Sequence, residues 1–156
     1  MSLNEEVELL RKIPLFAKIE PSKLKLLAFT SERLTFEAGH SLFHQGDMGD
    51  AAYVVVSGSA DVIVETAAGP VKVATFGRYD FLGEIAILCD VPRTATITAA
   101  SELTALRISK DLFFRLLNEF PQMAVEMMRV LALRLEKTTA DLTMARAALQ
   151  RPEERE

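Results

Sequence analysis

The sequence contains a single cysteine, no tryptophan and no long apolar run. One thiol, Cys89, cannot form a disulfide within the chain and suits a reducing compartment, so we expect the protein to be cytoplasmic. Cys89 flanks an apolar turn, and we expect it to be buried as a small hydrophobic residue. No apolar run approaches the roughly 18 residues of a membrane span and no signal peptide is recognisable, so we expect no membrane insertion.

A surplus of positive charge is also absent. The net charge is −4, so the surface as a whole does not attract nucleic acid. A DNA-reading helix-turn-helix would need further helices at the C-terminal end, whereas only residues 151–156, all charged or proline, follow residue 150. We therefore expect this chain to bind no nucleic acid.

The residues that are present are typical of one globular domain, which we predict over residues 1–156. The 156 residues are 49% hydrophobic and 26% charged, and a chain of this length buries about two thirds of its unfolded surface. Residues 1–30 are predicted to be helical. One helix spans residues 4–12 with Asn4 as its cap, and a second helix opens at Pro21.

Residues 31–108 have the pattern of a β-structure. Apolar and polar residues alternate, and glycine-bearing turns separate about eight short strands, which favours a jelly roll or a similar barrel. Residues 53–56 and 60–64 are predicted to pair as a hairpin. The predicted class is α+β, a double-stranded β-helix (jelly-roll) barrel flanked by the N-terminal helices and by C-terminal helices over residues 109–150.

The end of the chain is predicted to form one long helix, since no glycine or proline occurs between Gln122 and Gln150. Apolar residues recur there at alternating steps of four and three, the spacing of a coiled-coil seam. The seam consists of Ala124, Met128, Leu131, Leu135, Thr138, Leu142, Ala145 and Leu149. This pattern favours a homodimer through the C-terminal helix. The alternative is that the stripe packs on the chain's own barrel.

The segment 81–96 holds the residues with the clearest chemical use. Gly83 lets the backbone approach a partner closely, Glu84 can accept hydrogen bonds from a pair of hydroxyls, and the planar fork of Arg93 suits a phosphate. Residues 84–88 can form about one helical turn, whose free N–H groups suit an anion. The alternative is a structural ion pair between Glu84 and Arg93. The apolar residues expected to pin the turn to the core are Ile85, Ile87, Leu88 and Val91.

The order F-x-G-E-I-A-x-L, followed by P-R-T-A-T, resembles the phosphate-binding cassette of the cyclic nucleotide-binding domain family. The run L-F-x-Q-G-D-x-G-D, then Y-V-V-V-x-G, resembles another signature of that family. The resemblance implies that Glu84 binds the ribose 2′-hydroxyl, that Arg93 binds the cyclic phosphate, and that backbone N–H groups complete the cradle. The implied ligand-binding residues of the cassette are Gly83, Glu84, Ile85, Ala86, Arg93, Thr94 and Ala95.

Residues 134–139 resemble part of the dimer helix in the catabolite-activator members of this family. The resemblance implies that Thr138 contacts the base in its own subunit and that Thr139 reaches the ligand of the partner. A hydroxyl at Thr94 suits either purine and does not decide between them. We expect cyclic AMP, with cyclic GMP as the open alternative.

The resemblance implies a regulatory sensor module, not an enzyme, that holds no cofactor or metal besides its ligand. Ligand binding would move the C-terminal helix and relay the signal to a partner or fused output domain, which the sequence does not identify. Two alternatives stay open. One is a dimerisation scaffold with a vestigial pocket. The other is a cupin-type metal enzyme using His40 and His44, although the sequence holds no third histidine.

Overall fold

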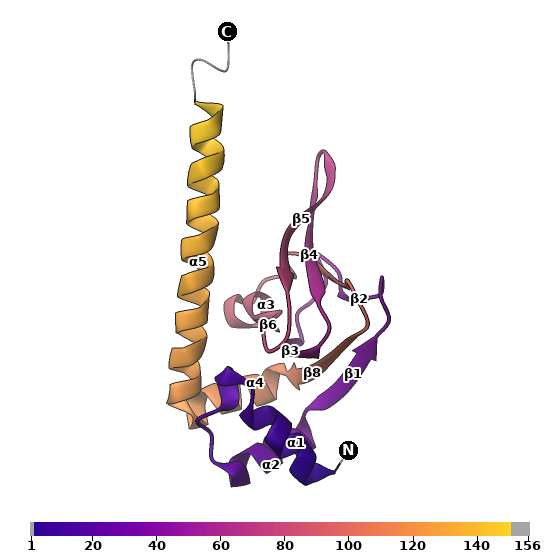
Figure 1. Cartoon of the computed structure of the whole chain (residues 1–156), viewed down its shortest axis with the longest axis vertical. Coiled ribbons are helices and arrows are strands. Elements are labelled where there is room, and N and C mark those ends of the chain that lie inside the picture. The colour runs from indigo at the N-terminus through magenta and orange to yellow at the C-terminus, as the bar shows by residue number, and fades with distance from the viewer. Residues whose placement is uncertain (1, 151–156) are drawn as a thin grey trace.

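The computed structural model describes residues 2–150, with helices at both ends of the chain and strands between them (Figure 1). The predicted α+β class is confirmed. The N-terminal helices are α1 (Leu3–Arg11), the 3₁₀ helix η1 (Pro14–Phe16) and α2 (Pro21–Thr30). The strands and the short helix among them are β1 (Glu32–Phe36), β2 (Ser41–Phe43), β3 (Ala51–Ser57), β4 (Ala60–Thr66), β5 (Gly69–Phe76), β6 (Phe81–Leu82), α3 (Glu84–Cys89), β7 (Thr96–Ala99) and β8 (Leu103–Ser109). The C-terminal helices are α4 (Lys110–Glu119) and α5 (Pro121–Leu149).

The strands form two antiparallel sheets of four, in the orders β1-β8-β3-β6 and β2-β7-β4-β5. The expected number of strands is therefore present. The sheets are not closed into a barrel, however, because every strand pairing within the described residues stays inside one sheet. The predicted jelly roll is therefore confirmed, in the form of two separate sheets of four strands.

The predicted hairpin of residues 53–56 and 60–64 is wrong. β3 pairs with β8 and β6, whereas β4 pairs with β5 and β7, so the two strands belong to different sheets. The turn between them carries the chain from one sheet to the other. Gly58 in this turn has φ 85°, and a Cβ there would collide with the carbonyl oxygen of Glu102, so both the backbone angle and the space require glycine.

β3 is buried along both faces, which explains why its sequence is a continuous apolar run and not an alternation. Ala51, Tyr53 and Val55 belong to the core between the two sheets. Ala52, Val54 and Val56 belong to a second core, where the first sheet meets the helices. The helices at both ends of the chain thus cover the outer face of this sheet.

α1 begins earlier than predicted, and its cap is Ser2, not Asn4. The Ser2 hydroxyl accepts a hydrogen bond from the Glu5 N–H at 3.2 Å, while Asn4 lies inside the first turn. α2 opens at Pro21 as predicted and buries Leu24 and Leu27. The N-terminal helices therefore pack on the fold through one apolar face.

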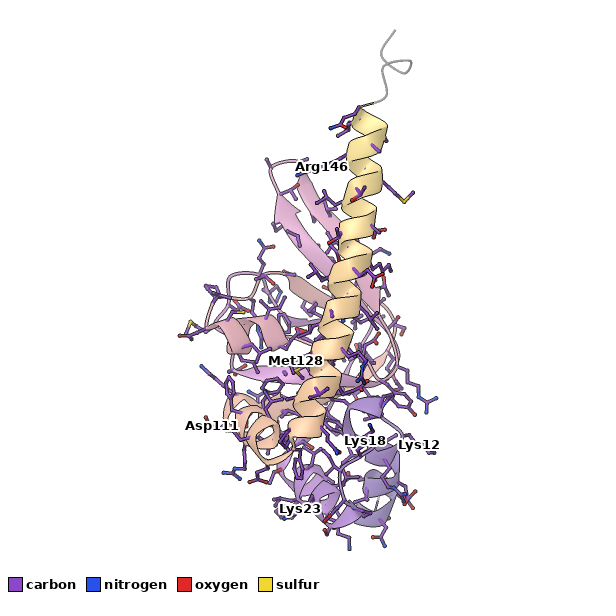
Figure 2. The ribbon with its side chains drawn as sticks, turned by 90° about the vertical axis from the view of Figure 1, so that its left-hand side faces the viewer. Lys12, Lys18, Lys23, Asp111, Met128 and Arg146 are labelled. Atoms are coloured by element: carbon purple, nitrogen blue, oxygen red, sulfur yellow. The ribbon has the colours of Figure 1, made fainter. Side chains whose placement is uncertain are left out.

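α5 is a separate helix because Phe120 leaves the helical conformation and Pro121 starts a new one. Only Met123 and Met127 of α5 are buried. Of the eight seam residues, Ala124 and Leu131 are half-buried and the other six are exposed. Figures 1 and 2 show the far half of α5 rising away from the N-terminal helices, with Arg146 near its end. The seam beyond Leu131 therefore does not pack on the chain's own sheets.

Candidate functional site

A cavity of about 320 Å³ lies where α3 and the strands face α5. Eight of the nine residues predicted to bind ligand line it. They are Gly83, Glu84, Ile85, Ala86, Arg93, Thr94, Ala95 and Thr138. Thr139 is exposed and does not line the cavity. The remaining wall is mostly apolar and consists of Phe43, Val62, Phe76, Leu82, Ile97, Leu131, Arg134 and Leu135.

Gly83 stands directly before α3 with φ 81°. A Cβ at this position would lie 3.0 Å from an Arg93 guanidinium nitrogen and 3.2 Å from the Phe43 ring. Glycine is therefore required both by the left-handed backbone and by the close approach of Arg93. This turn brings the first residue of α3, Glu84, to the cavity wall.

Arg93 is only 3% exposed and is held by backbone carbonyls. Its two terminal nitrogens donate to the carbonyl oxygens of Gly83 and Ala51, each at 2.7 Å. Its guanidinium carbon lies 3.9 Å from the centroid of the Phe43 ring. Its Nε is buried without a protein partner. Since a guanidinium carries five N–H donors, the bound side chain keeps donors for a further acceptor.

The predicted alternative of a Glu84–Arg93 ion pair is wrong, because Glu84 pairs with Arg134 of α5 instead. An Arg134 nitrogen lies 3.2 Å from Glu84 Oε1, and its second terminal nitrogen donates to the Phe81 carbonyl at 2.7 Å. The guanidinium also lies 4.4 Å from the ring centroids of both Phe76 and Phe81. Sequence reasoning missed this residue, which ties α5 to the start of α3.

The charges on the cavity wall leave an excess of one positive charge. Burial raises the pKa of the Glu84 carboxyl, and the Arg134 charge offsets part of that rise. Burial lowers the pKa of the Arg93 guanidinium, and nearby acidic groups raise it by a smaller amount. Arginine nevertheless stays charged at neutral pH. Two guanidinium groups and one carboxyl therefore face the cavity, and an anion is the ligand that this balance favours.

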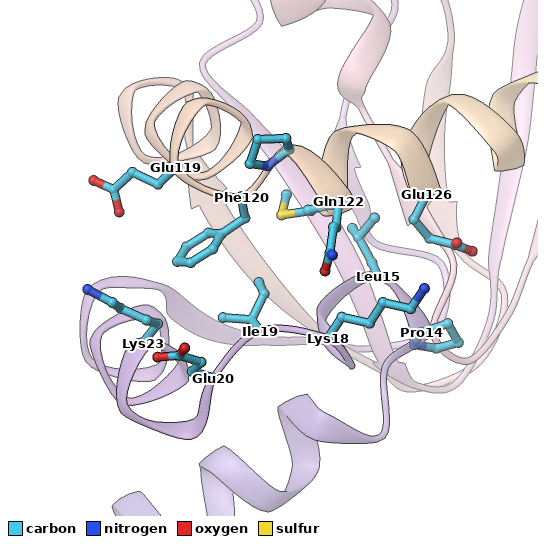
Figure 3. Close-up of a pocket in the computed structure, with 12 residues that line it drawn as sticks. Pro14, Leu15, Lys18, Ile19, Glu20, Lys23, Glu119, Phe120, Gln122 and Glu126 are labelled. Atoms are coloured by element: carbon cyan, nitrogen blue, oxygen red, sulfur yellow. The ribbon is translucent and has the colours of Figure 1, made fainter.

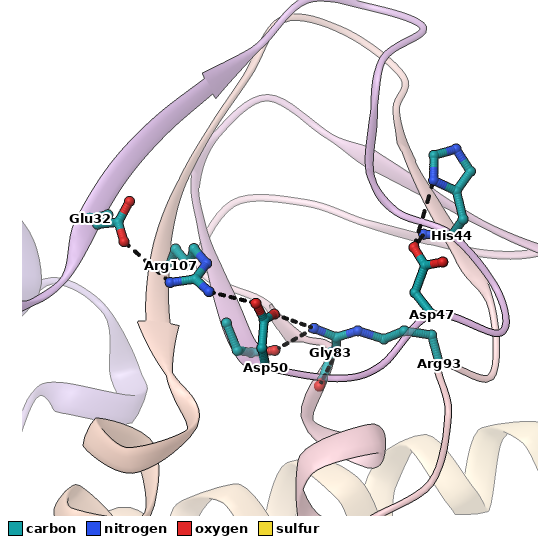
Figure 4. A network of polar contacts seen from close by, with 8 residues as sticks. Glu32, His44, Asp47, Asp50, Gly83, Arg93 and Arg107 are labelled. Atoms are coloured by element: carbon teal, nitrogen blue, oxygen red, sulfur yellow. Dashed lines mark hydrogen bonds and ion pairs between the residues drawn. The ribbon is translucent and has the colours of Figure 1, made fainter.

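A chain of ionic contacts leads from Arg93 to the edge strand β1 (Figure 4). Arg93 lies 3.8 Å from Asp50, and Asp50 accepts a hydrogen bond from Arg107 at 2.9 Å. Arg107 also donates to Glu32 at 3.2 Å. These contacts hold the loop before β3, and with it the Ala51 carbonyl that Arg93 binds.

Two expectations about side chains near the cassette are wrong. Ile85, Leu88 and Val91 are 48%, 39% and 39% exposed, so Ile87 is the one of the four predicted anchors that is buried. Cys89 is exposed as well. The reason is that α3 is a single short helix at the surface, and only one side of it meets the core.

The described residues provide no recognisable metal centre. Within residues 2–150, no group of three or more His, Cys, Asp or Glu side chains is placed to hold a metal ion. His40 and His44 are exposed on either side of β2, and His44 lies 3.9 Å from Asp47. Nor is any helix in this range both long and apolar enough to cross a bilayer.

Comparison with known proteins matches this architecture. The family model described as the cyclic nucleotide-binding domain matches residues 33–120. The cAMP-dependent protein kinase regulatory subunit of Aspergillus niger is 35% identical over 109 residues, which cover 70% of this chain and 26% of that protein. A CRP-like cAMP-activated global transcriptional regulator of Mycobacterium tuberculosis is 29% identical over 136 residues, covering 86% of this chain and 61% of the regulator.

A solved structure supports the same relation. The crystal structure of the Thermus thermophilus catabolite activator protein is similar with a TM-score of 0.74 at 26% identity, over 85% of this chain and 62% of that one. The three relatives are a regulatory subunit, a transcriptional regulator and an activator protein by name. The chain spans about a quarter of the kinase subunit and less than two thirds of the other two.

Proposed function

Because the chain belongs to the cyclic nucleotide-binding domain family, we propose that it is a sensor module that binds cyclic AMP in preference to cyclic GMP. Arg93 binds the cyclic phosphate, Glu84 binds the ribose 2′-hydroxyl, and the backbone of the α3 turn completes the cradle. The observation that carries this proposal is that Glu84 and Arg93, the two buried charged residues within residues 2–150, line one apolar cavity.

The phosphate end of the ligand is best served by Arg93. The side chain is fixed by two backbone carbonyls, so little side-chain entropy remains to be lost on binding. Each terminal nitrogen has a second N–H besides the one bound to a carbonyl, and a phosphate oxygen would satisfy these donors. An apolar wall around such a charge strengthens its attraction for an anion.

The base end of the ligand lies against α5 in this proposal. Thr138 shares the cavity with Glu84, and its hydroxyl can bind a base edge. The relatives from Aspergillus niger and Mycobacterium tuberculosis are named as cAMP-dependent or cAMP-activated, which favours cyclic AMP for this chain. Thr139, which does not line the cavity, would reach the ligand of a partner subunit across a dimer.

The signal would leave the site through α5. Arg134 connects this helix to Glu84. A ligand that binds Glu84 would therefore affect the contact that holds α5 in its position. A ligand shifts such an equilibrium only by its different affinity for the two positions. We propose that the moved helix acts on a second copy of the chain and on an output domain or partner.

The test is calorimetric titration of the chain with cyclic AMP and cyclic GMP, alone and in competition. We expect one site per chain and at least tenfold preference for cyclic AMP. A tenfold preference for cyclic GMP would reverse the assignment of the base. No binding of either nucleotide would favour the scaffold with a vestigial pocket.

A further inference from the structure

The structure has a cavity that is larger than the nucleotide pocket and separate from it. A cleft of about 560 Å³ lies between the N-terminal helices and the joint of α4 with α5 (Figure 3). Its volume is in the range of ordinary small-molecule sites. Its N-terminal wall, at residues 14–23, and its α5 residues lie outside the segment that the family model matches. The cleft is therefore not part of the site described above.

The cleft has an apolar floor and a charged rim. Leu15, Ile19 and Met123 form the floor, and all three are buried. Figure 3 shows Lys18 and Lys23 on the wall that comes from the N-terminal segment, with the Glu20 carboxylate beside Lys23. A floor of this kind excludes water from an apolar body, while the rim selects the charges at its ends.

The opposite wall carries carboxylates. Figure 3 shows Glu119 and Glu126 on the side of α4 and α5. In the part of the chain that the structure describes, no ion pair joins Lys18 or Lys23 to a carboxylate. The N-terminal wall, with two lysines and Glu20, thus has a surplus of one positive charge and faces two carboxylates across the apolar cleft.

We propose that this cleft is a second binding site, for a small apolar zwitterion that spans it. The carboxylate of the ligand lies at Lys18 and Lys23, the apolar body covers the floor, and the ammonium lies at Glu119 and Glu126. A molecule with only one charge leaves one wall without a counter-charge, so both charges are needed for full affinity.

The cleft also has a route to the nucleotide pocket. A second hollow of about 260 Å³ shares Pro14, Leu15 and Glu126 with the cleft and ends at Arg134. Arg134 is in turn a wall residue of the nucleotide pocket and the partner of Glu84. A ligand in the cleft would therefore change the preferred position of α5, the helix whose Arg134 holds Glu84. This coupling, unlike the site itself, rests on the proposed function.

The site is tested with three probes that share an eight-carbon chain, 8-aminooctanoate, octanoate and octylamine, in methyl NMR titrations of the whole chain. We expect saturable shifts of the Leu15, Ile19 and Met123 methyl groups. We expect 8-aminooctanoate to bind at least threefold more tightly than either single-charge probe, a modest factor because exposed ion pairs are weak. Equal affinities for the three probes, or no saturable shift, would overturn the proposal.

Variants separate the cleft from general charge effects. Lys18→Glu with Lys23→Glu makes the rim wholly acidic and should transfer the preference to octylamine. Lys12→Glu with Lys25→Glu makes the same change in net charge at exposed lysines outside the cleft and should leave the preference unchanged. If both pairs of substitutions act alike, the rim does not select the ligand. Ile19→Trp, which fills the floor, should abolish binding of all three probes.

The coupling is tested by titrating cyclic AMP with the cleft saturated by 8-aminooctanoate. We expect the affinity for cyclic AMP to change at least threefold, and by linkage the affinity of the probe to change by the same factor. The Ile19→Trp variant should lose this change. An unchanged affinity overturns the coupling. If cyclic AMP does not bind at all, the proposed function fails while the probe titrations still decide the cleft.

Discussion

Glu84 and Arg93 are buried charges of opposite sign that do not pair with each other. Each is held separately, Glu84 by Arg134 and Arg93 by the carbonyls of Gly83 and Ala51. A direct pair would leave few hydrogen-bonding groups for a ligand. Separate support keeps both side chains fixed and still able to bind, which is the arrangement that a polar ligand in an apolar cavity needs.

Arg93→Ala should weaken cyclic AMP binding by at least ~100-fold. The phosphate loses charge-assisted hydrogen bonds, each worth roughly 1.5–3 kcal/mol, and ~1.4 kcal/mol corresponds to a tenfold change. Arg93→Lys should also bind poorly, because a single ammonium cannot reach both carbonyls and a phosphate. Titration calorimetry measures the loss. Arg115→Ala, which removes an exposed arginine of α4, is the matched control and should bind normally. Affinity of Arg93→Ala within a few-fold of the parent would contradict the assignment.

As the pH is lowered, the affinity for cyclic AMP should begin to fall at a higher pH than it would if Glu84 had the pKa of an ordinary glutamate. Burial raises the pKa of the Glu84 carboxyl, and its protonation removes an acceptor from the ribose hydroxyl. Affinity should therefore decrease as pH drops toward the ordinary glutamate value of about 4.3. Folding stability should change in the opposite direction. Because the pKa of Glu84 is higher in the folded than in the unfolded state, its contribution to the free energy of unfolding increases as pH falls through that window.

Titrations across this pH window check the Glu84 prediction. Arg134→Gln removes the positive charge that lowers the Glu84 pKa, so the fall in affinity should move to higher pH. Glu84→Gln should show no such dependence, and 2′-deoxy cyclic AMP, which lacks the hydroxyl, should not share it. A parent protein with flat affinity in this window would remove Glu84 from the ribose site.

At the scale of the elements, α3 and β3 show what the sequence could specify. The cassette residues lie on one wall because they are close in sequence and one turn of helix follows Gly83. Local spacing also predicted the number of strands and the start of α2. It could not predict the partners of β3. A strand that is buried on both faces has the same continuous apolar sequence whether it pairs with the next strand in a hairpin or with strands distant in the chain.

Arg134 illustrates the limit for the site. Its partners Glu84 and Phe81 are 50 and 53 residues away in sequence, so no local pattern marks it as a site residue. The exposure of Cys89 was missed for a related reason. A short apolar segment predicts burial, but α3 has one face on the core and one face in solvent. Long-range packing decides both cases.

Two substitutions on α5 should separate its structural contact from its ligand contact. Arg134→Gln leaves the buried Glu84 carboxyl without its ion-pair partner and should lower both the melting temperature and the affinity for cyclic AMP. Thr138→Val removes a hydroxyl on the cavity wall and should lower the affinity about fivefold to tenfold, because one hydrogen bond contributes about 1 kcal/mol, while stability is kept.

Thermal melting and calorimetry distinguish the two effects. Thr143→Val is the matched control, since Thr143 is exposed on the same helix and lies outside the cavity. Thr138→Val with unchanged affinity would show that α5 does not reach the base. A Thr138→Val protein that loses stability as much as Arg134→Gln would show that its effect is not specific to the ligand.

For the whole molecule, the far half of α5 needs an explanation. Residues 136–149 are exposed throughout, and an isolated helix of this length is marginal in water. Leu135, Leu142 and Leu149 nevertheless present apolar side chains, each more than half exposed, at the spacing of a coiled-coil seam. A second copy of the chain, packed helix on helix, would cover this seam. The dimer therefore remains a proposal that follows from the heptad spacing and this exposure.

Leu142→Asp should convert the dimer to a monomer, because it introduces a charge at the centre of the paired seam. Leu133→Asp is the matched control. Leu133 is 60% exposed on the same helix, comparable with 51% for Leu142, but it lies off the seam. Sedimentation velocity with and without cyclic AMP measures the oligomeric state. Leu133→Asp should remain a dimer, and a parent protein that is monomeric at high concentration with ligand bound would refute helix pairing.

The same experiment tests whether ligand binding and dimer geometry are linked. Thr138 lies on the cavity wall and at a seam position, so in the proposed dimer one side chain would take part in both contacts. If the proposal is right, cyclic AMP should strengthen dimerisation of the parent, and the linkage should require an equal gain in cyclic AMP affinity on dimerisation. Leu142→Asp should then bind cyclic AMP more weakly, although Leu142 does not line the cavity. An unchanged affinity in the monomeric variant would mean that the helix pairs without sensing the ligand.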